Sequence, residues 1–542
     1  MKMKYLVLGA SRVGLRLLLA QSVLSASTAW AKPKILDRSV VGYWKFESGS
    51  ALKDSSGYGS DLNSPPSGVT TSGSGGFFSE AGYLSTPNGA TFTATLGKDD
   101  NGVSPSINLN SYHTIALWCR TASGVSMPSS SEAGSKAFAA LLNDHDWHFV
   151  AKRYQGTATE AKNAYAFYCD TQTIDWGNTS RAEVSGNTVY FPFSISGSSI
   201  TIGGDLGAYI FLVGKKTITF KGDMSYIVAV NRMMTKGELT RLGATGETYI
   251  YPVGNVSFAA KTGWSTTSVD NPTFDGYPGA FPGAAYIVDQ DKTLTGADGG
   301  TFGGSTDKKV SLTLGRLGAL KNLKTGAVVI EAAKAPGKFE HGTTASAGIT
   351  FYDLRLNDGI ITPKANNQSL TTTLLDVDAP SAKPFSVAVG DGHTYTFNAG
   401  GQVTGSGVLA KTGSGKLVLN NFTAAVGESP KVRLAEGLIK TPRLDGYTGG
   451  TVLVSTGSTV AFTGDDVLPP EGKKMQIAFD GAKPTAKTAV MTVPDGVTAT
   501  MIKDVTAYDG GKVGNVTVEN GMVFVEPGFP EDMGAVPVLM VE

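Results

Sequence analysis

Residues 40–63 read VVGYWKFESGSALKDSSGYGSDLN, and this stretch decides the fold class. Its first part places bulky residues at Val41, at Tyr43 and, after a shift of one position, at Phe46, as in a half-buried β-strand. The second part, from Asp54 onward, is a succession of turn-forming Asp, Ser and Gly residues. A strand that runs into a tight turn is typical of a protein built from many short β-strands.

The composition of the whole chain points the same way. With 542 residues, the chain is too long for one compact core, so we expect two or three domains. Glycine accounts for 69 residues, and stretches with a 3.6-residue apolar period are almost absent, which predicts an all-β protein. Lys plus Arg and Asp plus Glu number 46 each, and the resulting net charge of zero argues against a nucleic-acid partner.

The N-terminus has the pattern of an export signal. Two lysines precede an apolar run at residues 17–24, and an A-x-A cleavage site follows at residues 29–31. We therefore predict a signal peptide over residues 1–31 and an extracellular or cell-surface location. No later apolar run approaches the ~20 residues that a helix needs to span a bilayer, so we expect no transmembrane segment after cleavage.

Further strand-like segments follow one another through residues 32–251. The segments are FSEAGYLSTPN (78–88), TIALWCR (114–120), DWHFVAKR (146–153), YAFYCD (165–170) and GDMSYIVAVNRMMTKGELTRL (222–242). Together with the opening stretch they resemble, in order, the strands of the LamG-like, concanavalin A-like jelly-roll family. The resemblance implies a jelly-roll sandwich that contacts a glycan or a protein through its loops or its concave sheet.

Jelly-roll domains of this family often hold calcium, so the resemblance implies a calcium site. Its candidate ligands are Glu47, Asp54 and Asp223, because Ca²⁺ prefers carboxylate and carbonyl oxygens. The chain departs from the family at Ser225, where an acidic residue is usual, and at Thr171, where glycine is usual. The alternative interpretation is that Asp54 only caps its own turn.

Residues 143–148, NDHDWH, form the densest polar cluster in the chain. They are consecutive in a predicted hairpin turn and point in alternating directions, whereas zinc ligands converge from separate elements. We interpret the cluster as a polar turn that leads into a strand with Trp147 at its start.

The mature chain contains two cysteines, Cys119 and Cys169. Each lies in a predicted strand and in phase with apolar residues, so both could point into the same core. Export permits a disulfide between them. Two separate buried thiols are the alternative, because a disulfide requires Cα atoms within about 7 Å of each other.

The chain changes character after residue 251. Residues 252–283 are rich in Pro and Gly, and we interpret them as a linker. Short β-runs then recur through residues 284–484 with Gly-, Asn-, Ser- and Thr-rich segments between them, which predicts a β-solenoid whose turns bury their apolar faces against one another. We expect residues 485–542 to form a terminal β-cap or a small β module.

One part of the predicted solenoid has a sharper signature. Residues 405–421, GSGVLAKTGSGKLVLNN, and residues 447–452, YTGGTV, resemble the autotransporter-associated β-strand repeat. That repeat has a lysine before T-G-x-G, here Lys411, and then a strand of alternating Leu and Val that ends in asparagine. The resemblance implies a right-handed parallel β-helix of the passenger type.

Solenoid enzymes that act on polysaccharides need carboxylates clustered on one face. Here the acidic residues are dispersed in predicted turns, and His341 and His393 stand alone in loops where we expect them to face solvent. We therefore expect no enzymatic activity, no catalytic residue and no cofactor other than calcium.

The leading hypothesis is a secreted or surface protein of bacterial type, of unknown oligomeric state, whose jelly roll binds a glycan or a surface protein and is displayed on a β-solenoid stalk. The first alternative is a purely structural component of a surface assembly, without a soluble ligand. The third hypothesis is a polysaccharide-active β-helix enzyme.

Overall fold

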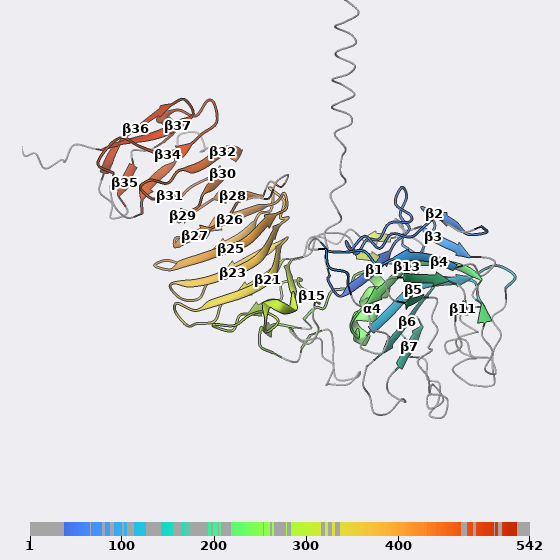
Figure 1. The fold of residues 1–542 in the computed structure, drawn as a ribbon. Helices are drawn as coiled ribbons and strands as arrows, with labels where there is room; N and C mark the ends of the chain where they lie inside the picture. Colours follow the sequence, from blue (N-terminus) through green and yellow to red (C-terminus); the bar gives the residue numbers. More distant parts are fainter. Residues whose placement is uncertain are drawn as a thin grey trace, which may run out of the picture.

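The computed structural model describes residues 37–527 with gaps, of which the longer ones are 106–112, 126–142, 155–164, 174–192, 207–217, 265–277, 323–327, 331–335 and 468–473. The predicted signal peptide therefore lies outside the described residues. The described chain folds into an antiparallel sheet domain followed by a parallel β-solenoid (Figure 1). The all-β prediction is confirmed, and so is the solenoid.

The sheet domain is organised around two central strands, β5 (His113–Thr121) and β13 (Gly222–Val230), which pair side by side. Nearly every residue of both strands is buried, as expected for strands covered on both faces. The order of the main sheet is β2-β3-β13-β5-β6-β7-β8, and β1 also pairs with β13. The other strands of this sheet are β1 (Val40–Trp44), β2 (Thr70–Ser72), β3 (Tyr83–Thr86), β6 (His148–Tyr154), β7 (Tyr165–Cys169) and β8 (Gln172–Thr173).

Helix α4 (Lys236–Thr245) covers one face of this sheet. It begins with a capping box, in which the Thr235 hydroxyl accepts a bond from the Glu238 backbone and the Glu238 side chain accepts one from Thr235, and it ends at Gly246 in the left-handed conformation. Leu239 and Leu242 are buried in one apolar cluster with side chains of β5, β6 and β13. The predicted closing strand and short helix are therefore present. Two smaller sheets join β4 (Thr91–Thr95), β10 (Ser199–Gly203) and β9 (Phe193–Ser196), and β11 (Asp205–Leu206) with β12 (Ile218–Thr219).

The solenoid has about 7 turns. Each strand pairs in parallel with the equivalent strand of the next turn, so that β20 pairs with β22, β22 with β24 and β24 with β26. Alternate side chains point inward and form one continuous apolar core. The strands that build it are β14 (Val256–Ser257), β15 (Ala285–Val288), β16 (Thr293–Thr295), β17 (Ser311–Leu314), β20 (Gly337–Glu340), β21 (Gly348–Leu356), β22 (Gly359–Thr362), β23 (Gln368–Val377), β24 (Phe385–Ala388), β25 (Thr394–Thr404), β26 (Val408–Thr412), β27 (Lys416–Asn420), β28 (Lys431–Leu434), β29 (Leu438–Lys440), β30 (Arg443–Tyr447), β31 (Thr451–Val454), β32 (Val460–Val467) and β33 (Gln476–Phe479).

The far end of the solenoid is covered by antiparallel strands. β36 (Lys512–Glu519) and β37 (Met522–Pro527) form a hairpin that pairs with β34 (Thr488–Thr492) and β35 (Val505–Ala507). Val523 and Val525 of β37 are fully buried in the solenoid core. The described part of residues 485–542 therefore has the form of the terminal β-cap, the first of the two alternatives that the sequence left open.

The interpretation of residues 252–283 as a linker is wrong for the part that the structure describes. β14 pairs in parallel with β16, and Phe258 and Trp264 are buried in the solenoid core. These residues form the first layer of the solenoid. The Pro and Gly residues concealed this layer, because it contributes isolated inward aromatic residues and only a two-residue strand.

The chain passes from the sheet domain directly into the solenoid. Ile250 donates to the carbonyl of Ala285 at 2.8 Å and accepts from the amide of Ile287 at 2.9 Å, so it extends the sheet beside β15. The guanidinium of Arg38 lies 5.8 Å from the ring centroid of Tyr352 in β21. The two parts are therefore held together by backbone and side-chain contacts.

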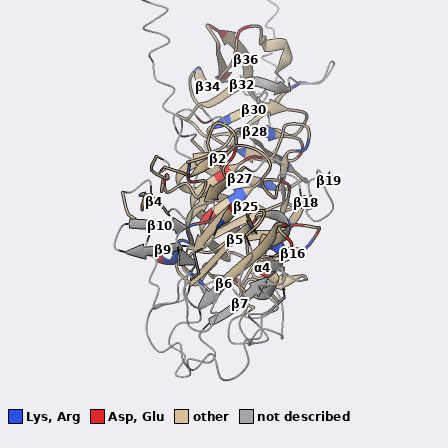
Figure 2. Ribbon diagram, turned by 90° about the vertical axis from the view of Figure 1, so that its right-hand side faces the viewer, with Lys and Arg blue, Asp and Glu red and all other residues tan. Residues whose placement is uncertain are grey.

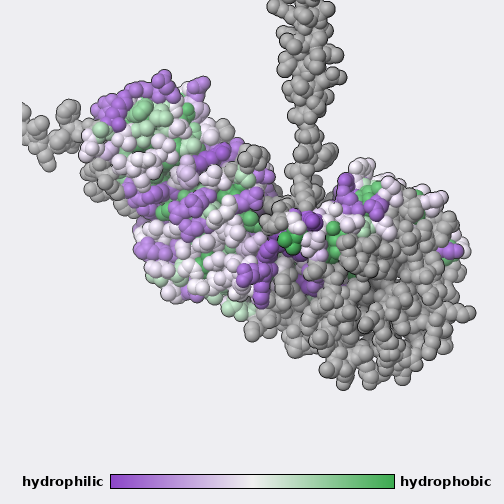
Figure 3. Space-filling model, viewed as in Figure 1, coloured by the Kyte–Doolittle hydropathy of each residue, from purple (hydrophilic) through white to green (hydrophobic). Residues whose placement is uncertain are grey.

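Charge is distributed along the described strands without a large region of one sign (Figure 2). The face of the solenoid seen in Figure 3 is mostly hydrophilic or neutral, with small hydrophobic areas. Among the residues that the structure describes, no helix is long and apolar enough to cross a membrane.

Candidate functional site

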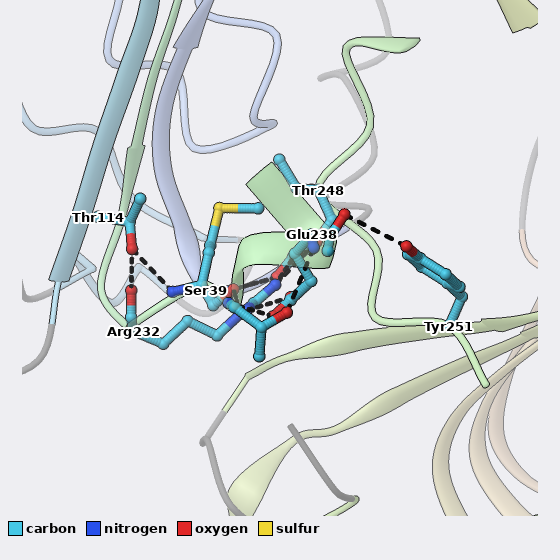
Figure 4. A network of polar contacts seen from close by, with 10 residues as sticks. Ser39, Thr114, Arg232, Glu238, Thr248 and Tyr251 are labelled. Atoms are coloured by element: carbon cyan, nitrogen blue, oxygen red, sulfur yellow. Dashed lines mark hydrogen bonds and ion pairs between the residues drawn. The ribbon is translucent and has the colours of Figure 1, made fainter. Parts of the chain in front are cut away.

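A dense buried polar network lies at the junction of the two parts (Figure 4). Arg232 follows β13 and donates to Glu238 of α4 at 2.5 Å, to the carbonyl of Thr248 at 2.8 Å and to the hydroxyl of Ser39 at 3.1 Å. Arg232 and Glu238 are almost fully buried; burial raises the pKa of Glu238, and the charge of Arg232 opposes that shift. We assign this network a structural role, since it closes the sheet domain and has no exposed reactive group.

Asp54, the first candidate calcium ligand, is 2% exposed and serves as the centre of its turn. Its carboxylate accepts backbone bonds from Tyr43, Ser56 and Ser60, each at 2.9 Å, and a bond from the Ser56 hydroxyl at 2.6 Å. The four donors account for both carboxylate oxygens. Asp54 therefore caps its turn, as the alternative interpretation proposed.

The other two candidate ligands lie in separate ion pairs. Glu47 is 3.7 Å from the ammonium of Lys45, and Asp223 accepts from Nε of Arg120 at 2.8 Å. Within the described residues there is no group of three or more His, Cys, Asp or Glu side chains placed to hold a metal ion. The structure does not bring the three candidates together.

The two cysteines lie on strands that are not neighbours. Cys119 of β5 pairs with His148 of β6, and Cys169 of β7 pairs with Val150 of β6, so one strand separates them. Neighbouring strands are about 4.8 Å apart, which places the two Cα atoms at least about 9 Å from each other. This distance exceeds the limit for a disulfide, and Cys119 is buried as a thiol.

The NDHDWH cluster forms the polar turn that the sequence predicts. His148 Nε2 lies 2.8 Å from the carboxylate of Asp144, and His145 Nδ1 lies 2.9 Å from the hydroxyl of Thr121. His145 adopts a left-handed backbone conformation with φ 63°. His148 thus contacts Asp144 of the turn, His145 ties the turn to β5, and Trp147 immediately precedes β6.

Four partly exposed side chains, Tyr83, Arg120, Trp147 and Asp223, meet on one face of the sheet. Arg120 and Asp223 are cross-strand partners, and Tyr83 points to the same side because it is two residues from Ser85, which pairs with Asp223. The guanidinium of Arg120 lies 4.7 Å from the ring centroid of Trp147 and 5.4 Å from that of Tyr83. We call these four residues the aromatic–arginine surface.

Buried and partly buried aromatic residues support this surface from the same side of the sheet. Trp118 is two residues before Arg120 on β5, and the ring of Phe77 stacks on it. Phe78 meets Trp118 edge-on at 6.4 Å, and Phe149 lies 5.5 Å from it. The packed rings fix the backbone positions from which Arg120 and Trp147 project.

The aromatic–arginine surface combines the groups that bind polar ring-shaped ligands. The rings of Tyr83 and Trp147 offer apolar faces, while the guanidinium of Arg120 donates and the carboxylate of Asp223 accepts. The guanidinium of Arg120 lies against both rings, which meet each other edge-on with centroids 6.2 Å apart, and its Nε is bonded to Asp223. Little side-chain freedom therefore remains to be lost when a ligand binds.

Sequence reasoning missed this surface, because its four residues lie in separate segments, and each segment was interpreted only as evidence for the fold. One signal was present. In TIALWCR the charged Arg120 is in phase with Trp118, so it lies on the same side of the strand as an aromatic residue.

Lys411, the lysine of the repeat motif, points into a corner of the solenoid and is fully buried. Its ammonium donates to the carbonyls of Thr412 at 2.7 Å, of Glu436 at 3.2 Å and of Gly413. Burial lowers the pKa of Lys411 to about 8. The motif lysine therefore satisfies the carbonyls of stacked turns and does not form a site.

The expectation that His341 faces solvent is wrong, because this residue is 1% exposed. It lies inside the same kind of corner, where its ring contacts Tyr395. A histidine in a glycine-rich segment is expected to lie in an exposed loop. The prediction failed because this segment forms a buried corner between two strands of the solenoid. His393 lies in a turn, where its amide donates to Gly390 at 3.2 Å.

No protein-family model matches this chain, and no curated protein matches it. Among solved structures, it is similar to the receptor binding domain of botulinum neurotoxin D, with 9% identity and a TM-score of 0.25, over 38% of this chain and 52% of that chain. The binding domain of Paraclostridial Mosquitocidal Protein 1 gives 15% identity and a TM-score of 0.25 over 38% and 52% of the two chains. These alignments span about half of the matched domains, and at such TM-scores they support no conclusion about function.

Proposed function

We propose that this protein is a non-catalytic, exported binding protein whose sheet domain binds a glycan through the aromatic–arginine surface. The observation that supports this function is the position of Arg120, which lies against the rings of Tyr83 and Trp147 and is paired with Asp223 on a partly exposed face. A sugar ring presents C–H groups that pack against an aromatic face. Its hydroxyls can accept from the guanidinium and donate to the carboxylate.

A neutral glycan fits this surface better than an acidic one. Nε of Arg120 is bonded to Asp223 at 2.8 Å, so the pair carries no net charge. An acidic sugar would have to compete with Asp223 for the guanidinium, whereas a pair of hydroxyls can use both partners at once.

The solenoid acts in this proposal as the support of the binding domain. Its core is continuous from the first layer to the terminal cap, and the sheet domain is joined to its first turns by backbone bonds at Ile250. The predicted signal peptide would export the protein to the extracellular or cell-surface location that this proposal requires.

A glycan array probed with the full mature chain, residues 32–542, tests the proposal, followed by calorimetry with the best glycan. The full chain is needed because the solenoid completes the junction with the sheet domain. We expect Trp147→Ala and Arg120→Met to weaken binding at least tenfold, which corresponds to about 1.4 kcal/mol. Arg433→Met is the matched control: this arginine binds Ser381 on the solenoid, and its loss should leave affinity unchanged.

An array without any bound glycan would contradict the proposal and favour the alternative of a purely structural component. Binding that survives both Trp147→Ala and Arg120→Met would place the glycan elsewhere. Circular dichroism of each variant shows whether lost binding reflects a lost fold.

A further inference from the structure

His341 lies inside the solenoid, directly after β20. Its Nε2 atom is 2.9 Å from the hydroxyl of Tyr395, and the two rings meet edge-on with centroids 5.2 Å apart. The ring of Phe339 lies edge-on at 5.4 Å. Nδ1 of His341 is buried and has no hydrogen-bond partner among the described residues. Such a buried polar atom has a substantial desolvation cost, so its position calls for an explanation.

The contact between His341 and Tyr395 joins different turns of the solenoid. β20 pairs with β22 and β22 with β24, and Tyr395 lies in β25, the strand after β24. Gln368 belongs to the turn in between, pairs in register with Tyr395, and donates to the carbonyl of Gly342 at 2.7 Å and to that of Thr344 at 3.0 Å. The corner is thus held by polar side chains that reach from one turn to another.

We propose that the contact of His341 with Tyr395 is sensitive to acid. Protonation of His341 opens this corner of the solenoid and loosens the turns next to the sheet domain. The proposal stands on the geometry. A charged imidazole needs an acceptor at each nitrogen. Among the described residues, the folded corner offers Nε2 the hydroxyl of Tyr395 and offers Nδ1 no hydrogen-bond partner.

The direction of the pH effect follows from the linkage between protonation and opening. Burial lowers the pKa of His341 to about 4 in the closed corner, while an opened corner exposes a histidine with an ordinary pKa of about 6.5. The open state therefore binds the proton more tightly. Opening is unaffected above pH ~6.5 and becomes more favourable, by at most about tenfold per pH unit, as the pH falls from ~6.5 to ~4.

The charged and titratable groups around His341 do not cancel this effect. Asp298, from the loop after β16, favours the protonated form, but burial is the larger influence on the pKa. Glu340 and Lys364 form an ion pair at 3.1 Å. Tyr395 remains protonated, since burial raises its pKa.

The position of the corner connects it to the sheet domain. β20 pairs in parallel with β16, and the segment before β16 contains Asp289, which pairs with Arg241 of α4 at 3.4 Å. Loosening these turns would weaken the support of the sheet domain in an acidic environment.

Amide hydrogen exchange of the full mature chain at pH 7.5, 6.0 and 5.0, corrected for intrinsic exchange rates, tests the proposal. We expect the protection of residues 337–356 and 394–398 to fall up to about tenfold per pH unit below ~6.5, with much smaller changes in β28 to β31. His341→Gln keeps a donor for Tyr395 and does not titrate, so its corner should lose this pH dependence. His393→Gln is the matched control and should behave like the unmodified protein.

Equal protection of the corner at all three pH values would overturn the proposal, as would an unchanged pH dependence in His341→Gln. If His341→Gln does not fold, an NMR titration of the His341 ring in the unmodified protein tests the proposal instead. A folded-state pKa near 6.5 would overturn the proposal, and a ring that stays neutral down to pH ~5 supports it.

Discussion

Arg241 of helix α4 and Asp289 of the solenoid form an ion pair, with 3.4 Å between Nη2 and Oδ2. Arg241 also pairs with Glu247 at 3.0 Å, and its guanidinium lies 4.5 Å from the ring centroid of Tyr251. One side chain of the sheet domain thus contacts three residues on the path into the solenoid. A sheet domain on a loose linker would lack these contacts. Because the contacts are present, we expect the sheet domain and the solenoid to unfold cooperatively.

The first prediction concerns this ion pair. Asp289 is fully buried, and burial raises its pKa, so Arg241→Ala leaves a buried carboxylate without this cation and should cost about 3 kcal/mol. Asp289→Asn removes the buried negative charge itself, so it should cost less stability than Arg241→Ala. The control is Lys338→Ala, because Lys338 pairs with Asp291 on the surface and should matter by at most about 0.5 kcal/mol. Urea unfolding measures all three; a loss for Asp289→Asn that exceeds the loss for Arg241→Ala would contradict this explanation.

The second prediction separates the turn-capping role of Asp54 from calcium binding. Asp54→Ala leaves the buried backbone donors of Tyr43, Ser56 and Ser60 without an acceptor and should lower stability by about 3 kcal/mol. Glu47→Ala should change stability by less than about 0.5 kcal/mol, since its ion pair with Lys45 is partly exposed. Chelation with EDTA should leave the melting temperature unchanged. A melting temperature that rises with added Ca²⁺ and stops rising in Asp54→Ala would restore the calcium site.

The third prediction concerns Lys411. Lys411→Met leaves buried carbonyls without a donor and should cost about 2 to 4 kcal/mol, whereas Lys440→Met should cost less than about 1 kcal/mol because Asp480 keeps its contact with Lys416.

The same comparison has a defined pH dependence. Since the pKa of Lys411 is lowered to about 8 in the folded state, the unfolded chain binds this proton more tightly, and the contribution of Lys411 to stability rises from pH ~8 to ~10.5. The stability difference between the unmodified protein and Lys411→Met should therefore grow over that range. A difference that shrinks would show that the carbonyls hold the ammonium more strongly than burial disfavours it.

The fourth prediction compares two glycines with the same backbone conformation. Gly437 and Gly457 have φ of 73° and 83°, so alanine is strained at either position by about 1 kcal/mol. A Cβ at Gly437 would also meet the carbonyl oxygen of Gly413 in the neighbouring turn, while a Cβ at Gly457 would meet nothing within 4 Å. Gly437→Ala should therefore cost more than about 3 kcal/mol in thermal unfolding. Equal losses for the two variants would mean that the stacked turns can move apart at little cost.

Much of the fold could be predicted from local patterns. The apolar run of TIALWCR gives β5, the D-S-S-G turn gives the contacts of Asp54, and K-L-V-L-N gives β27 with its alternating inward Leu417 and Leu419. These features depend on the alternation of side chains along a strand and on the backbone preferences of turn residues, both of which are local properties.

Local patterns were therefore sufficient to predict that this chain forms short strands, where most of them lie and that they stack into a solenoid. Which side chains meet was not predictable in this way. Arg120 comes to lie against Tyr83 and Trp147, and His341 against Tyr395, because strand register and the stacking of turns bring distant segments together. Register depends on the packing of the whole core and on how each buried polar group finds a partner, and no single stretch of sequence contains that information.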